Sequence, residues 1–331
     1  MKRREFLISA VAIGAVASAR RGWAQGAKQA KQSTLDRIAI MTLNFQRMLK
    51  LPDLPEGSER TLELFDVPQM IADRYGVHKV EFQHYHIPST ELSYLTELRA
   101  RIEKTKSRMT QINLEFGMLN MSEPELRNRL MAIDLTKMWV DHAVMLGAQR
   151  VMINQGRPTQ ENKVYGIPTL KAMADYGKSK GIIVSVETRG GGGGNRGAAA
   201  GARGAAPGAA PAAPPPATAA PSPAAAAPTP PLTGPAAWTL LAEILKGAGA
   251  YSNVDVGGAG AANQEELHAC LNMLFPMTAG SMHTRVNPRW DLATAIRFLE
   301  HELGYKGLYT IESSGGHEGT KEIYDVVVAT V

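Results

Sequence analysis

Four stretches in the second half of the chain decide its fold: IIVSVETRG (182–190), YSNVDVGG (251–258), MTAGSMHTR (277–285) and GLYTIESSG (307–315). Each is short and rich in apolar and β-branched residues, and three of the four end in glycine, which is typical of a buried strand. Apolar and polar side chains alternate towards the end of each stretch. We therefore expect four neighbouring strands whose polar faces point the same way.

The same pattern of short apolar runs and amphipathic stretches extends over the rest of the chain. The predicted strands are 37–44, 77–83, 109–117, 149–155, 181–187, 250–255, 277–283 and 305–312. The predicted helices between and after them are 62–75, 90–107, 123–146, 168–180, 236–248, 264–275, 291–303 and 321–331. Such alternation predicts a parallel sheet, and eight units predict an α/β (β/α)8 TIM barrel over 25–331. An open, doubly wound sheet is the alternative.

A stretch of low complexity interrupts this pattern. Residues 190–235 are nearly all Gly, Ala and Pro, a composition that offers no apolar periodicity to offset the entropy of ordering. We predict a disordered insertion within the barrel, after the fifth strand. Without it and the leader the chain has 261 residues, close to the roughly 250 of one barrel.

Residues 1–24 have the features of an export signal. A basic start that contains Arg3 and Arg4 precedes an apolar run, and cleavage is expected after Ala24. The paired arginines resemble a twin-arginine (Tat) signal. We predict export by the Tat machinery to the periplasm or outside the cell, without stable membrane insertion after cleavage. An uncleaved anchor is the alternative.

The charge of the chain argues against a nucleic-acid partner. The net charge of +5 falls to +1 once the leader is removed, whereas proteins that bind nucleic acid usually keep a basic folded domain. The single cysteine, Cys270, excludes an intrachain disulfide. The sequence does not indicate an oligomeric state.

The last four predicted strands end in metal-ligand chemistry, with Glu187, Asp255, His283 and Glu312 in that order. Period-two alternation places each of them on the polar face of its strand. Converging carboxylates repel one another unless a cation lies between them. This hard, oxygen-rich set predicts one divalent ion, Mn²⁺, Mg²⁺, Zn²⁺ or Co²⁺.

This order of residues, together with the phrase GVHKVEFQ (76–83), resembles the sugar phosphate isomerase/epimerase superfamily of xylose isomerase-like TIM barrels. The resemblance implies that Glu187, Asp255, His283 and Glu312 bind one ion. It also implies that Glu187 and Glu312 are the catalytic acid and base in a sugar isomerase or epimerase. The ion would stabilise an enediolate during proton transfer.

The sequence departs from the family at two positions. Gly258 stands where many members have histidine, and Val286 where they have aspartate. For substrate binding we predict four further residues near strand ends: Glu81, His84, Arg285 and Arg289.

Three other functions stay open. They are a sugar lyase or hydrolase on the same barrel, a non-catalytic periplasmic sugar-binding protein, and an endonuclease IV-like enzyme. The last is disfavoured by the near-neutral mature charge and the small number of histidines. Because an exported protein rarely meets phosphorylated sugars, a free sugar or polyol is the expected substrate.

Overall fold

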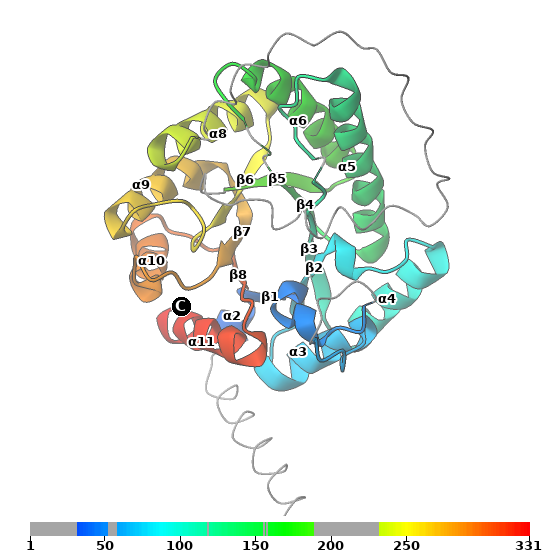
Figure 1. The fold of residues 1–331 in the computed structure, drawn as a ribbon. Helices are drawn as coiled ribbons and strands as arrows, with labels where there is room; N and C mark the ends of the chain where they lie inside the picture. The colour runs from blue at the N-terminus through cyan, green and yellow to red at the C-terminus, as the bar shows by residue number, and fades with distance from the viewer. Residues whose placement is uncertain (1–31, 52–57, 118, 155, 157, 189–231) are drawn as a thin grey trace, which may run out of the picture.

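The predicted closed barrel is confirmed (Figure 1). The computed structural model describes residues 32–51, 58–117, 119–154, 156, 158–188 and 232–331. Its parallel strands are β1 Ile38–Met41, β2 Lys79–Gln83, β3 Arg108–Leu114, β4 Arg150–Ile153, β5 Ile183–Glu187, β6 Tyr251–Asp255, β7 Thr278–Thr284 and β8 Leu308–Ile311. They follow one another in chain order, and β8 pairs with β1 through Ile38 and Tyr309 to close the barrel.

Helices surround the strands as an outer ring (Figure 1). The α-helices are α2 Gln32–Leu35, α3 Val67–Tyr75, α4 Leu92–Lys104, α5 Leu126–Leu146, α6 Lys163–Ser179, α8 Gly234–Ala248, α9 Gln264–Leu274, α10 Leu292–Arg297 and α11 Gly316–Thr330. Shorter 3-10 turns are η1 Thr42–Met48, η2 Leu64–Asp66, η3 His84–His86 and η4 Phe275–Met277, and η5 Phe298–Glu302 is a π turn.

The core lies between the strands and the helices. Val184 and Val186 of β5 are buried there, on the opposite face from Glu187, as the alternation predicted. Trp238 of α8 is also buried in this layer, and its indole N–H donates to the carbonyl of Ala259 at 2.7 Å. The apolar alternation therefore fixes which face of each strand is left for the inside of the barrel.

Glycines end two of the helices. Gly76 follows α3 with φ of +66°, and Gly147 follows α5 with φ of +72°. This left-handed conformation is strained for residues with a Cβ atom, so glycine is favoured at helix ends.

Several predicted boundaries were wrong. The first strand ends at Met41 rather than at residue 44, because Thr42 begins the 3-10 turn η1. Helix α6 begins at Lys163 rather than at 168. Reciprocal hydrogen bonds between Thr159 and Asn162 form the turn that precedes the helix. Because the helix begins before residue 168, Pro168 lies inside it.

Helix α11 begins at Gly316 rather than 321, and the predicted helix 291–303 divides into α10 and η5. Helix α8 begins at Gly234 and so includes the last two residues of the predicted insertion. Residues 190–231 of that insertion and the predicted signal 1–24 lie outside the described residues.

An ion-pair cluster lies at the amino-terminal end of the barrel. Arg37 donates to both carboxylate oxygens of Glu300 at 2.9 and 2.7 Å, and the hydroxyl of Tyr309 donates to the same carboxylate at 2.6 Å. In barrels of this kind the amino-terminal face serves stability, whereas chemistry lies at the carboxyl ends of the strands.

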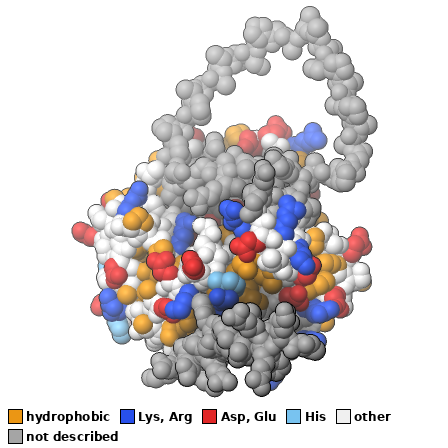
Figure 2. Space-filling model, turned by 60° about the horizontal axis from the view of Figure 1, so that its bottom comes forward, with side chains coloured by type: hydrophobic (Ala, Val, Ile, Leu, Met, Phe, Trp, Pro, Cys, Tyr) orange, Lys and Arg blue, Asp and Glu red, His pale blue; other side chains and the backbone are white. Residues whose placement is uncertain are grey.

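The described surface carries mixed charge. On the face shown in Figure 2, acidic and basic side chains are interspersed. Among the described residues, the helices lack the combination of length and apolarity that a membrane span needs.

Candidate active site

His283 lies at the centre of a polar cluster inside the carboxyl end of the barrel. Its side chain is 1 % exposed and reaches the cluster from β7. Nδ1 lies 3.1 Å from Oε1 of Glu187 and 3.3 Å from Oε2 of Glu312. These carboxylates come from β5 and from the residue after β8. Three of the four predicted ligands therefore meet around one ring nitrogen.

This group has the spacing of a metal site. One donor atom from each of Glu187, His283 and Glu312 lies within 4.8 Å of the other two. All three side chains are largely shielded from water, and Oε2 of Glu312 contacts Nδ1 of His283 at 3.3 Å without the geometry of a hydrogen bond. Buried carboxylates in such proximity are costly without a cation.

Asp255, the fourth predicted ligand, lies beside this group in a different arrangement. Its Oδ1 accepts the backbone N–H groups of Gly257 and Gly258 at 2.9 and 2.8 Å. Its Oδ2 lies 2.6 Å from Nη2 of Arg285, whose Nη1 is 3.5 Å from Oε1 of Glu312. The guanidinium therefore bridges two of the carboxylates that were predicted to share a metal ion.

The glycines at 257 and 258 make room for this arginine. A Cβ atom at Gly258 would lie 1.9 Å from Oδ2 of Asp255 and 2.0 Å from Nη2 of Arg285. A Cβ atom at Gly257 would lie 2.0 Å from Cγ of Arg285. The position of Arg285 therefore depends on the absence of a side chain at Gly257 and Gly258, whereas Val286 is exposed on the following loop.

Burial and crowding of charge change the acidity of the cluster. Burial, followed by the nearby Glu312 carboxylate, raises the pKa of Asp255 from 3.8 to about 7, although Arg285 opposes the rise. Burial alone would lower the pKa of His283, but the surrounding carboxylates, Glu81 first, outweigh it and hold this pKa well above 6.5. Burial is the main cause of the shift of Asp255, and the surrounding carboxylates cause the shift of His283.

Glu81 was predicted to bind substrate, and the structure places it beneath His283. It is fully buried on β2, and its Oε1 lies 2.7 Å from Nε2 of His283. Asn113 and Gln111 of β3 donate to the same oxygen at 2.7 and 3.2 Å. These two amides were not predicted, although their period-two spacing in the third strand was a visible signal.

The other two predicted substrate-binding residues, His84 and Arg289, contact groups other than the clustered carboxylates. His84 is 7 % exposed and packs against Phe116, with ring centroids 3.8 Å apart. Burial lowers its pKa to about 4, so the ring is neutral. Arg289 is exposed, and its guanidinium donates to the carbonyl of Ala261 at 3.2 Å. Substrate binding by either residue stays a prediction.

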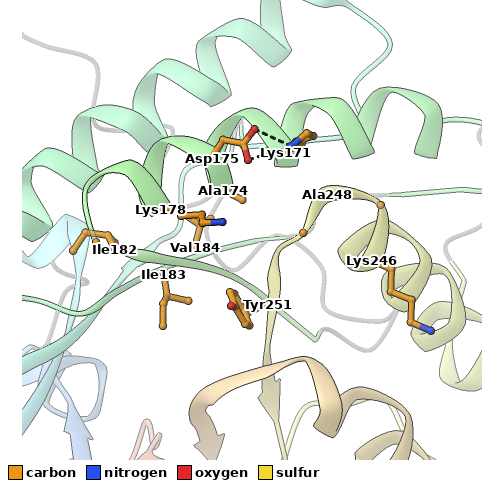
Figure 3. Close-up of a pocket in the computed structure, with 13 residues that line it drawn as sticks. Lys171, Ala174, Asp175, Lys178, Ile182, Ile183, Val184, Lys246, Ala248 and Tyr251 are labelled. Carbon is orange, nitrogen blue, oxygen red and sulfur yellow. Dashed lines mark hydrogen bonds and ion pairs between the residues drawn. The ribbon is translucent and has the colours of Figure 1, made fainter.

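A pocket in another part of the molecule is shown in Figure 3. It lies at the amino-terminal ends of β5 and β6, beside the ends of α6 and α8, and Lys178, Lys246 and Tyr251 are among its lining residues. It is therefore at the opposite end of these strands from Glu187 and Asp255.

Comparison with known proteins relates the chain to a group of solved structures. A D-psicose 3-epimerase from Clostridium cellulolyticum H10, solved with D-tagatose, has a TM-score of 0.60 and 11 % identity over 89 % of this chain and 95 % of that one. A xylose isomerase domain protein from Planctomyces limnophilus has a TM-score of 0.57 and 13 % identity over 89 % and 96 %.

A probable 3-DHS dehydratase from Bacillus anthracis has a TM-score of 0.55 and 10 % identity over 89 % of this chain and 97 % of that one. No family model matches the sequence. No curated protein matches it either. At these identities the likeness establishes the fold alone, a (β/α)8 barrel.

Proposed function

We propose that this chain is a divalent-metal-dependent isomerase or epimerase that acts on a sugar or polyol. The observation that carries the proposal is the buried group of Glu187, His283 and Glu312, whose donor atoms lie within 4.8 Å of one another at the carboxyl end of the barrel. The kinds of protein that share the fold, a D-psicose 3-epimerase among them, support the reaction class.

The residues present fit a divalent ion. Two glutamates and a histidine supply oxygen and imidazole donors, which suit Mn²⁺, Mg²⁺, Zn²⁺ or Co²⁺. Asp255 would join them by exchanging its contact with Arg285 for the ion. A bound ion would polarise the carbonyl and neighbouring hydroxyl oxygens of a substrate and so acidify the adjacent C–H.

Glu187 and Glu312 are the proposed proton-transfer pair. They reach the cluster from β5 and from the end of β8, three strands apart around the barrel. One carboxylate removes the proton next to the carbonyl. In an epimerase the other, in its acid form, returns a proton to the opposite face of the same carbon. No electrons enter or leave, so neither reaction needs a redox cofactor.

Two measurements test this proposal in order. Elemental analysis of the purified protein should find about one divalent ion per chain, which is lost in the Glu187→Ala/His283→Ala double variant. Absence of metal after reconstitution with each of the four ions would refute the proposal. Glu312→Gln should then abolish exchange of a substrate C–H with solvent deuterium while the variant stays folded.

A lyase is the second candidate. A dehydratase shares the fold, and the same pair of carboxylates could remove a proton and assist departure of a hydroxyl group as water. An unsaturated product formed with loss of water would favour this reading, whereas deuterium incorporation without loss of water would favour the epimerase.

We also propose that the protein is exported by the Tat machinery and works in the periplasm or outside the cell. The support is the paired Arg3 and Arg4 before an apolar run. Replacing both with lysine should leave the uncleaved protein in the cytoplasmic fraction, and unchanged export would contradict the proposal.

A further inference from the structure

The two ring nitrogens of His283 face different groups of partners. Nδ1 faces Glu187 and Glu312, the residues proposed to bind the ion. Nε2 faces the opposite way, 2.7 Å from Oε1 of Glu81. A histidine that binds a metal through one nitrogen commonly donates its other N–H to a carboxylate, which fixes the tautomer and the orientation of the ring.

We propose that Glu81 is a positioning residue for His283. Its carboxylate accepts the Nε2–H and so leaves the lone pair of Nδ1 directed at the cation site. This inference rests on the proposed metal site, and it replaces the substrate-binding role that the sequence suggested for Glu81.

The contacts of Glu81 fix its carboxylate as an acceptor. Oε1 receives one N–H from the side-chain amide of Asn113 and another from Gln111. Gln111 also donates to Oδ1 of Asn113 at 2.9 Å, so the two amides are held in these orientations. An oxygen surrounded by donors favours a protonated Nε2 on the histidine that faces it.

The burial of Glu81 argues against contact with substrate. Its side chain is 0 % exposed, and its contacts with His283 and the two β3 amides occupy the oxygen that faces the cluster. Glu81 can therefore influence chemistry at the mouth of the barrel only through the histidine that covers it.

The consequence is a contribution to metal affinity. Loss of such an outer carboxylate typically weakens metal binding 10- to 100-fold. Replacing Glu81 by glutamine keeps an oxygen that can accept from these neighbours but removes the negative charge, so the histidine loses part of its basicity and binds the ion more weakly.

The test compares Glu81→Gln with Glu300→Gln by titration calorimetry with Mn²⁺ and Zn²⁺. Glu300→Gln is the matched control, because it also removes a shielded carboxylate of the barrel, at the amino-terminal end. We expect Glu81→Gln to bind at least 10-fold more weakly than the wild type, and Glu300→Gln to bind like the wild type.

A second measurement is made on the wild type. In the Zn²⁺-loaded wild type, ¹⁵N NMR of the histidines, assigned with His283→Gln, should show Nδ1 bound to metal and Nε2 protonated. Equal affinity of the wild type and Glu81→Gln, or ligation through Nε2, would overturn the role of Glu81 alone. A wild type that binds no metal would overturn the proposed function together with it.

Discussion

Asp255 should make the metal-free protein less stable as the pH rises. Its pKa is 3.8 in an unfolded chain and about 7 in the fold, mainly because the carboxyl group is buried. Between these values the folded protein keeps a proton that the unfolded chain releases. The free energy of unfolding therefore falls with rising pH over this range.

The size of the effect follows from the two pKa values. They differ by about 3, and each unit is worth 1.36 kcal/mol, so full ionisation of Asp255 costs ~4 kcal/mol. Asp255→Asn removes this cost, because the amide oxygen can still accept from the backbone N–H groups of Gly257 and Gly258. The variant should match the wild type near pH 4 and exceed its stability by pH 8.

Urea unfolding in EDTA at pH 4 to 8 measures this difference. Asp291→Asn is the control. Asp291 caps α10, and its hydrogen bonds to Thr294 lower its pKa. The stabilisation that its ionised carboxylate provides is therefore lost only below pH 4. The difference in the free energy of unfolding between Asp291→Asn and the wild type should stay constant from pH 4 to pH 8. If the difference in the free energy of unfolding between Asp255→Asn and the wild type is the same at pH 4 and pH 8, the reasoning is refuted.

Three further predictions concern the packing at Gly258, the ion pair of Arg37 and the predicted insertion. Gly258→Ala should cost about 1–3 kcal/mol in urea unfolding, because its Cβ atom displaces the contact between Asp255 and Arg285; unchanged stability would count against this packing. Arg37→Met should cost about 1.5–3 kcal/mol, because Glu300 loses the two-point contact with the guanidinium and keeps Tyr309 and Lys306 as partners, with metal affinity unchanged; reduced metal affinity would contradict the separation of the two ends of the barrel. Deleting 190–231 should leave the circular dichroism and melting temperature of the barrel unchanged, and insoluble protein would argue otherwise.

The sequence predicted the barrel and the neighbourhood of its site for the same physical reason. Apolar alternation fixes which side chains face inward, and parallel strands bring their carboxyl ends to one edge. Glu187, His283 and Glu312 could therefore be grouped without knowledge of any distance.

The contacts across the barrel could not be predicted in this way. Which of the inward side chains touch depends on the stagger of the strands, and this places Glu81 beneath His283 rather than at the mouth. The pairing of Arg285 with Asp255 depends on the space above Gly257 and Gly258. From the sequence alone, Gly258 differs only in standing where the family that the chain resembles has histidine, and nothing marks Gly257.

Charge balance connects these contacts to the choice of substrate. The ionisable groups of the cluster are Glu81, Glu187, Asp255, Glu312, His283 and Arg285. With every carboxylate ionised and His283 protonated, the cluster carries an excess of two negative charges. A divalent ion adds two positive charges but requires a neutral histidine, so the excess falls to one. A phosphorylated or acidic sugar would increase that excess in a dry site, whereas a neutral sugar or polyol would leave it unchanged. The charges in the barrel therefore favour the uncharged substrate class proposed above, and a sugar acid preferred over its neutral parent would contradict this balance.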